Sequence, residues 1–212
     1  MNESSLREHM VMLGESLHAR GLAGGSSGNI SVKLDDGILV TPTGTSLGRL
    51  DPARIAKVKW DGTLCETSGD PPSKETFLHL AMYRERASAG AIVHLHSTWS
   101  VCVSCMAEVD PADCLPPLTA YYVMKVRKLP LIPYYPPGDL TLADAVRSQA
   151  RQHHAMLLAN HGPVVAGPSL DTAVDIIEEL EETAKIFLLL RGTLTRCLTA
   201  EQVAVLRERF PS

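Results

Sequence analysis

Residues 90–100 read GAIVHLHSTWS, an apolar run that carries two histidines, His94 and His96. The run predicts a buried strand, and side chains at i and i+2 of a strand point to the same face. The two imidazoles should therefore lie side by side, with Val93 and Leu95 on the opposite face. Two neutral imidazoles at this spacing can hold one divalent ion if a third ligand joins them. The alternative is a pair of core histidines satisfied by backbone carbonyls, and the pair alone favours neither.

Helices and strands are predicted on both sides of this stretch. Apolar residues at positions 6, 10, 13 and 17 indicate an amphipathic helix, which Gly21 ends. Strands are predicted at NISVKL, ILVTP and RIAKVKW, and a helix in SKETFLHLAMYRER with Ser73 as its cap. Two strands should meet at 160–162, followed by a helix over 170–191 and a last one capped by Thr199 with Gln202. This pattern predicts an α/β fold with a mixed or antiparallel sheet and helices on both faces.

Length and composition favour one globular domain spanning residues 1–212. Apolar residues make up 45% and charged residues 21% of the chain, which is typical of a globular domain with one core. The net charge of −4 disfavours a nucleic-acid partner. No apolar stretch approaches the roughly 20 residues that cross a bilayer, and the polar start MNESSLREHM does not resemble a leader peptide.

The cysteines favour a reducing compartment. Five of them at irregular spacing do not form a disulfide framework, so a cytoplasmic location is expected. Cys102 and Cys105 have CxxC spacing, but no second pair completes four zinc ligands. Core packing on a helix is the favoured role for both.

A third histidine favours the metal interpretation. His161 lies in LLANHGPVV, at the end of an apolar run and beside Gly162. Three histidines leave a coordination position open, which is the pattern of a catalytic rather than a structural zinc site. The expected ion is Zn²⁺, with Mn²⁺ or another divalent metal as alternatives. The other histidines are read as surface or packing residues: His9, His18, His79, His153 and His154.

Glu75 is the candidate acid/base. It stands in PPSKETFLHL near the start of a predicted helix, where a carboxylate is often only a favourable partner of the helix dipole. Beside a metal and partly desolvated, the same carboxyl can carry a proton.

Three short segments are suited to hold an anion. Helix N-termini and glycine-rich loops present free backbone N–H groups. The segments are GGSSGNIS, TPTGTSLG and the start of the Glu75 helix, and their candidate residues are Ser27, Gly28, Asn29, Thr43, Gly44, Ser73 and Lys74. Each is weak alone, since such loops are usually only turns.

These motifs together resemble the class II aldolase/adducin-head family over nearly the whole chain. The resemblance is carried by SSGNIS, ILVTPTGTSLGRLDP, SKE, VHLHS and LANHG. It implies a three-layer α/β/α fold around a mainly antiparallel sheet, and a homotetramer with active sites between subunits. It also implies zinc on His94, His96 and His161, Glu75 as acid/base, and a phosphate pocket at the loop residues above. The chain departs from the family's usual SSE with SKE, so Lys74 meets extra negative charge.

The middle segment LPPLTAYYVMKVRKLPLIPYYPPGDL resembles the decarboxylase branch of this family, which acts on 3-oxo-tetronate 4-phosphate. The resemblance implies conversion of that keto acid phosphate to dihydroxyacetone phosphate and CO₂ through a zinc-stabilised enediolate that Glu75 protonates. Tyr122, or its neighbour Tyr121, is expected to orient the substrate or relay a proton, and aromatic packing is the favoured role for at least one of the two. Two alternatives stay open: a sugar-phosphate aldolase or epimerase of the L-fuculose- or L-ribulose-phosphate type, and a non-catalytic adducin-like binding module.

Overall fold

The computed structural model describes residues 2–65, 68–136 and 138–210. Within these residues, seven strands form one sheet in the order β3-β2-β1-β4-β7-β6-β5. The strands are β1 (Asn29–Lys33), β2 (Gly37–Val40), β3 (Ala56–Lys59), β4 (Ala91–His94), β5 (Leu131–Ile132), β6 (Ala155–Leu158) and β7 (Gly162–Gly167). Every pairing is antiparallel except that of β5 with β6. The expected mainly antiparallel sheet is confirmed.

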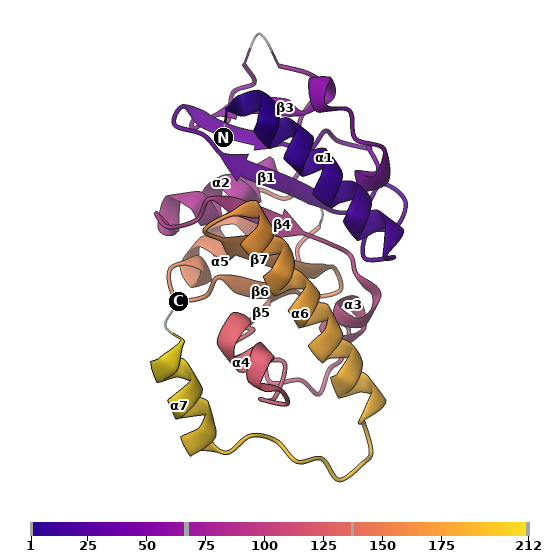
Figure 1. Ribbon diagram of the computed structural model, residues 1–212, viewed down its shortest axis with the longest axis vertical. Helices are drawn as coiled ribbons and strands as arrows, with labels where there is room; N and C mark the ends of the chain where they lie inside the picture. Colours follow the sequence, from indigo (N-terminus) through magenta and orange to yellow (C-terminus); the bar gives the residue numbers. More distant parts are fainter. Residues whose placement is uncertain (1, 66–67, 137, 211–212) are drawn as a thin grey trace.

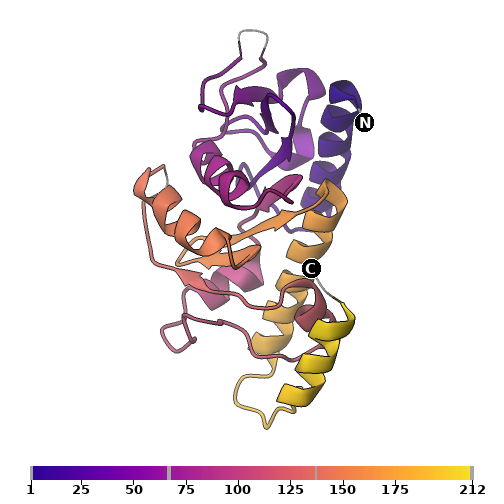
Figure 2. The ribbon, with the colours of Figure 1, turned by 90° about the vertical axis from the view of Figure 1, so that its left-hand side faces the viewer.

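Helices cover both faces of the sheet, as Figures 1 and 2 show. Helices α1 (Glu3–Ala19) and α6 (Leu170–Leu189) lie on one face, and α2 (Thr76–Glu85) and α5 (Thr141–Ala150) on the other. The remaining helices are α3 (Thr98–Ser104), α4 (Ala120–Lys125) and α7 (Ala200–Arg209), and single 3₁₀ turns occur at Leu47–Arg49 and Pro52–Arg54. The α/β/α layering predicted from the resemblance is confirmed.

Alternation along the strands divides the core into two parts. In β4, Val93 and the following Leu95 pack into the cluster beneath α1 and α6, whereas Ile92 packs against α2 and α5. His94 therefore points to the face that α2 covers, because side chains alternate along a strand. The histidine pair and α2, the helix that follows Glu75, therefore lie on the same face of the sheet.

Most of the predicted boundaries are found within a few residues. Thr199 and Gln202 form the expected capping box at α7. The helix after Ser73 begins later than predicted: Glu75 is its N-cap residue, and α2 starts at Thr76. Ser73 still accepts a hydrogen bond from the backbone N–H of Glu75, at 3.3 Å, so a short turn precedes the helix proper.

The core-packing prediction for Cys102 and Cys105 is wrong. Both lie at the end of α3, and both are exposed. No helix within the described residues is both long enough and apolar enough to span a membrane.

Candidate active site

His94 and His96 form the floor of the site at the end of β4. His94 is fully buried, and its Nδ1 lies 2.8 Å from the carbonyl oxygen of Pro163 on β7. A carbonyl only accepts hydrogen bonds, so Nδ1 carries the hydrogen and Nε2 keeps its lone pair. The Nε2 atoms of His94 and His96 lie 3.1 Å apart, so both rings turn the same edge toward one point.

His161 reaches that point from the turn between β6 and β7. Asn160 has a positive φ of 55° and Gly162 one of 153°, and a Cβ at Gly162 would lie 2.3 Å from the carbonyl oxygen of Leu95. Only glycine allows the turn to approach the end of β4 so closely. The ring centroid of His161 lies 4.8 Å from that of His94 and 4.7 Å from that of His96.

Glu75 completes the cluster from the opposite side. Its Oε2 lies 3.4 Å from His94 Nε2, and its Oε1 lies 3.2 Å from His161 Nε2. Oε1 is nevertheless buried without a hydrogen bond of acceptable geometry within the described residues. One ligand atom from each of the four side chains lies within 4.8 Å of the others.

Burial controls the charges of this cluster. It lowers the pKa of His94 to about 4, although Glu75 opposes the shift, and it lowers the pKa of His96 in the same direction. Burial alone would raise the pKa of Glu75, but the neighbouring His94 and His161 and a hydrogen bond from Asn29 outweigh it, so the pKa lies below its ordinary value. At pH 7 the cluster therefore offers the Glu75 carboxylate and the neutral imidazoles of His94 and His96, with the His161 ring beside them, and this donor set fits a divalent cation.

A cavity of about 700 Å³ opens beside the cluster. All the loop residues proposed from sequence line it, together with Glu75, His96 and His161. They arrive from three separate segments: Ser27, Gly28 and Asn29; Thr43 and Gly44; Ser73 and Lys74. Among the described lining residues, Lys74 is the single lysine or arginine.

The structure places Tyr122 away from this cavity. Its side chain is buried in the core under α1 and α6, and its hydroxyl lies 3.5 Å from Asp113 Oδ1. Tyr121 is 61% exposed and does not line the cavity either. Two other tyrosines of the same middle segment, Tyr134 and Tyr135, do line it.

Sequence reasoning missed several lining residues, including Thr98, Val101, Cys102 and Asn160. Three of these belong to α3, which begins two residues after His96. A helix that follows a ligand strand so closely must flank the site, and this short spacing was the available signal. The exposed Cys102 thus lies at the cavity rather than in the core.

Comparison with known proteins shows which family this chain resembles. The family model for the class II aldolase and adducin N-terminal domain matches residues 8–188. A 3-oxo-tetronate 4-phosphate decarboxylase of Escherichia coli (strain K12) is 50% identical over 206 residues, which are 97% of this chain and 96% of that protein.

Solved structures give the same relationship. The crystal structure of YgbL from Escherichia coli superposes with a TM-score of 0.94 at 48% identity, covering 97% of this chain and 99% of that one. An L-fuculose 1-phosphate aldolase superposes with a TM-score of 0.90 at 26% identity, covering 100% of this chain and 99% of that one.

Proposed function

Because this chain belongs to the class II aldolase and adducin N-terminal domain family, we propose that it is a decarboxylase of 3-oxo-tetronate 4-phosphate. It is a carbon–carbon lyase, as its close relatives' names and its family indicate. The observation that carries the proposal is the convergence of three imidazoles and one carboxylate beside a cavity lined by the loop residues that we propose to bind the phosphate. One domain, residues 1–212, provides these groups.

His94, His96 and His161 would hold a divalent cation, for which we propose Zn²⁺. The nearly buried Glu75 and the lone pair at His94 Nε2 support this assignment. When bound, such an ion supplies a Lewis acid that stabilises negative charge on substrate oxygens. A carboxylate β to a ketone is the substrate that benefits, because loss of CO₂ leaves charge on the neighbouring carbon and the ketone oxygen.

The chain's own residues bind the substrate and move one proton. The backbone amides and hydroxyls of Ser27–Asn29, Thr43–Gly44 and Ser73 surround the cavity rim, and Lys74 adds positive charge for the phosphate. Glu75 rests as the carboxylate, takes up one proton from solvent and donates it from Oε1 to the carbon that CO₂ leaves. One proton is consumed, one CO₂ is released, and the product is dihydroxyacetone phosphate.

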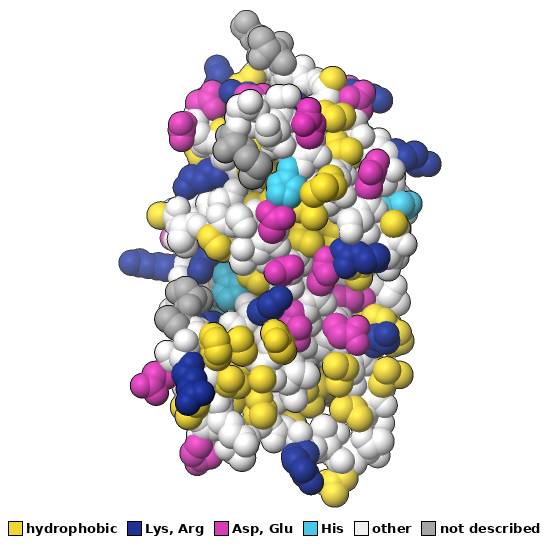
Figure 3. All heavy atoms as spheres, viewed as in Figure 1, with side chains coloured by type: hydrophobic (Ala, Val, Ile, Leu, Met, Phe, Trp, Pro, Cys, Tyr) yellow, Lys and Arg dark blue, Asp and Glu magenta, His cyan; other side chains and the backbone are white. Residues whose placement is uncertain are grey.

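Two further properties belong to the proposal. We expect a cytoplasmic homotetramer with its sites between subunits, as the family resemblance implies. Figure 3 shows hydrophobic side chains gathered over the part of the molecule that α4, α6 and α7 occupy. Exposed apolar residues there include Leu189, Leu190, Leu194, Val205 and Phe210, and such surface favours association with other copies. Light scattering of the purified protein measures the subunit number.

The decisive experiment offers the metal-loaded protein two substrates. With 3-oxo-tetronate 4-phosphate, we expect release of CO₂ and triose phosphate in equal amounts. With L-fuculose 1-phosphate, we expect little aldehyde. Efficient cleavage of the sugar phosphate with no reaction of the keto acid would replace the proposal by the aldolase alternative. Failure to recruit any divalent ion would instead favour a binding module.

A further inference from the structure

A chain of buried polar side chains leads away from Glu75 between α2 and β1. Residues 75, 79 and 83 follow one another at helical spacing, and they are Glu75, His79 and Tyr83. Asn29 and Ser31 alternate with Ile30 along β1 and face the same helix. The helix residues recur every four positions and the strand residues every two. The side chains therefore form one line in which residues from the helix and from β1 alternate.

Each contact along this line is short. Asn29 Nδ2 lies 2.8 Å from Glu75 Oε2, and Asn29 Oδ1 lies 2.6 Å from His79 Nε2. Ser31 Oγ lies 2.7 Å from His79 Nδ1 and 3.0 Å from the hydroxyl of Tyr83. His79 and Ser31 are fully buried, and Tyr83 and Asn29 are nearly so.

The chemistry of the groups sets the direction of the hydrogen bonds from Glu75 as far as Ser31. The carboxylate of Glu75 accepts only, so Asn29 must present its NH₂ group to it. Asn29 Oδ1 then faces His79, and as an acceptor it requires the hydrogen on Nε2. The neutral ring keeps a lone pair on Nδ1, which accepts from the Ser31 hydroxyl. The single hydrogen of the Tyr83 hydroxyl is directed to Ser31, whose backbone carbonyl oxygen and Oγ lie 3.1 and 3.0 Å away. Burial lowers the pKa of His79 to about 3, so the ring stays neutral.

This direction matters for Glu75. An asparagine amide without the His79 donor can turn over and bring its oxygen against the carboxylate, which repels it. With the amide held, Oε2 is occupied, and Oε1 stays buried without a hydrogen-bond partner among the described residues. Oε1 is the oxygen that faces His161.

We propose that His79 is a positioning residue for Glu75: with Ser31 and Tyr83 behind it, His79 holds the amide of Asn29 so that one carboxylate oxygen is tied down and the other is presented to the substrate. The inference rests on the proposed function for its kinetic effect. A network that serves only the stability of the core makes the same contacts, so the test needs readouts that stability alone does not move.

The first test compares two variants of His79 in the metal-loaded full chain, using whichever substrate the wild type turns over. His79→Gln keeps a side-chain N–H near the position of Nε2, whereas His79→Leu keeps volume without a donor. We expect His79→Leu to lose at least about tenfold in kcat with KM changed less than about threefold, and His79→Gln to regain most of the loss. Equal kcat for the two variants, or a loss confined to KM, would overturn the proposal.

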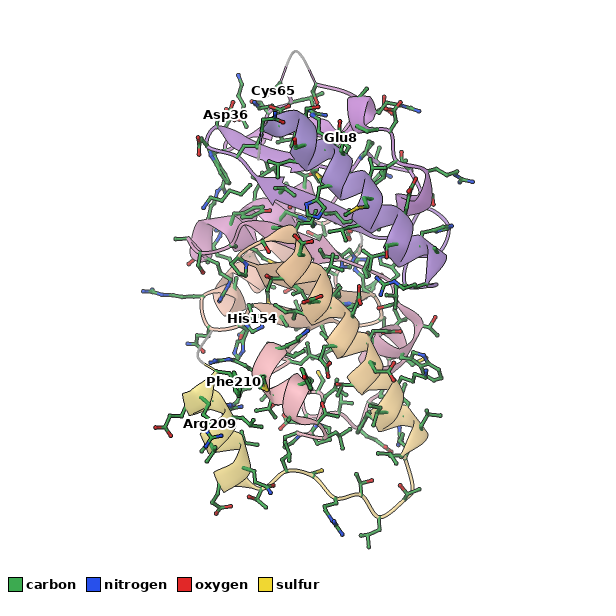
Figure 4. All side chains as sticks on the ribbon, viewed as in Figure 1. Glu8, Asp36, Cys65, His154, Arg209 and Phe210 are labelled. Carbon is green, nitrogen blue, oxygen red and sulfur yellow. The ribbon has the colours of Figure 1, made fainter. Side chains whose placement is uncertain are left out.

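His154→Gln is the matched control. His154 is also buried and also bonds through Nε2, which lies 2.7 Å from the carbonyl oxygen of Lys125 beside α4 (Figure 4). Its hydrogen bond goes to the backbone near α4, whereas Asn29 bonds Glu75 and His79. We expect His154→Gln to change stability and leave kcat as in the wild type, and a kcat loss matching that of His79→Leu would count against a specific role for His79.

The second test needs neither activity nor a variant that folds. Nitrogen-15 spectroscopy of the wild-type ring should find His79 neutral, with its hydrogen on Nε2, between pH 6 and 8. A ring with its hydrogen on Nδ1 would overturn the proposal, because Asn29 would then lack its donor. A wild type that releases no CO₂ would refute the proposed function, while this spectrum still decides how the Asn29 amide is held.

Discussion

Acidification from pH 7 to pH 5 should weaken the fold through His79. In the unfolded chain, His79 takes up a proton below its ordinary pKa of 6.5. In the folded protein, burial lowers the pKa of the same side chain to about 3. The unfolded state therefore binds more protons between these two values. Stability is full above pH 6.5 and is lost progressively as the pH falls toward about 3.

The magnitude follows from how far pH 5 lies below the unfolded pKa of 6.5, because the pKa in the fold is lower still. Each pH unit below 6.5 removes about 1.4 kcal/mol, so a fall to pH 5 removes about 2 kcal/mol from the free energy of unfolding. The folded protein cannot readily accommodate a protonated ring, because His79 Nδ1 and Nε2 both make hydrogen bonds and the side chain is fully buried.

Urea unfolding at pH 7 and pH 5 measures this quantity, followed by the fluorescence of Trp60 and Trp99. The protein is treated with a chelator and kept at one concentration, so that metal and assembly do not change between conditions. His79→Gln is the comparison, since it cannot titrate and every other group remains. We expect the wild type to lose about 2 kcal/mol more than the variant. Equal losses would refute the reasoning that His79 is held neutral by burial.

Four further predictions concern the site and its supports. Glu75→Gln should retain bound metal, measured by elemental analysis, and lose at least about 100-fold in kcat; unchanged kinetics would remove Glu75 from the acid/base role. His96→Ala should lose the metal on dialysis, and a variant with full metal content would exclude His96 as a ligand. Gly28→Ala should lower thermal stability and activity together, because Gly28 has a φ of 80° and its added Cβ would lie 2.9 Å from the His94 carbonyl oxygen; a fully active, equally stable variant would contradict this. Glu181→Ala should cost about 3 kcal/mol in urea unfolding, because its buried carboxylate accepts three hydrogen bonds at the start of α3; a loss below about 1 kcal/mol would contradict it.

Local patterns predicted much of the architecture correctly. The alternation in residues 90–100 put His94 and His96 on the face opposite Val93, and the structure agrees. The capping box at Thr199 could be predicted because its two partners, Thr199 and Gln202, lie three residues apart in the sequence. Patterns of this kind involve residues that are close in the sequence, so they can be recognised without knowledge of the fold.

Other features could not be read in the same way. His79 was interpreted as a surface or packing residue, Tyr122 was expected at the substrate, and Cys102 was expected in the core. Each of these depends on which surface a side chain meets. Helix α2 packs on β1 and buries its own His79 against Asn29 and Ser31 of that strand. Cys102 is exposed near the end of α3 and lines the cavity.

By itself, the sequence determined the strand with its paired histidines, the loops and caps around it, and the residue types that metal and anion chemistry need. Only the tertiary structure decided that His161 and Glu75 meet this pair, and that Asn29 turns its amide to Glu75. The physical reason is range: backbone propensity and periodicity act over a few residues. The distances within the site depend instead on β7 pairing with β4 and on α2 packing against the sheet.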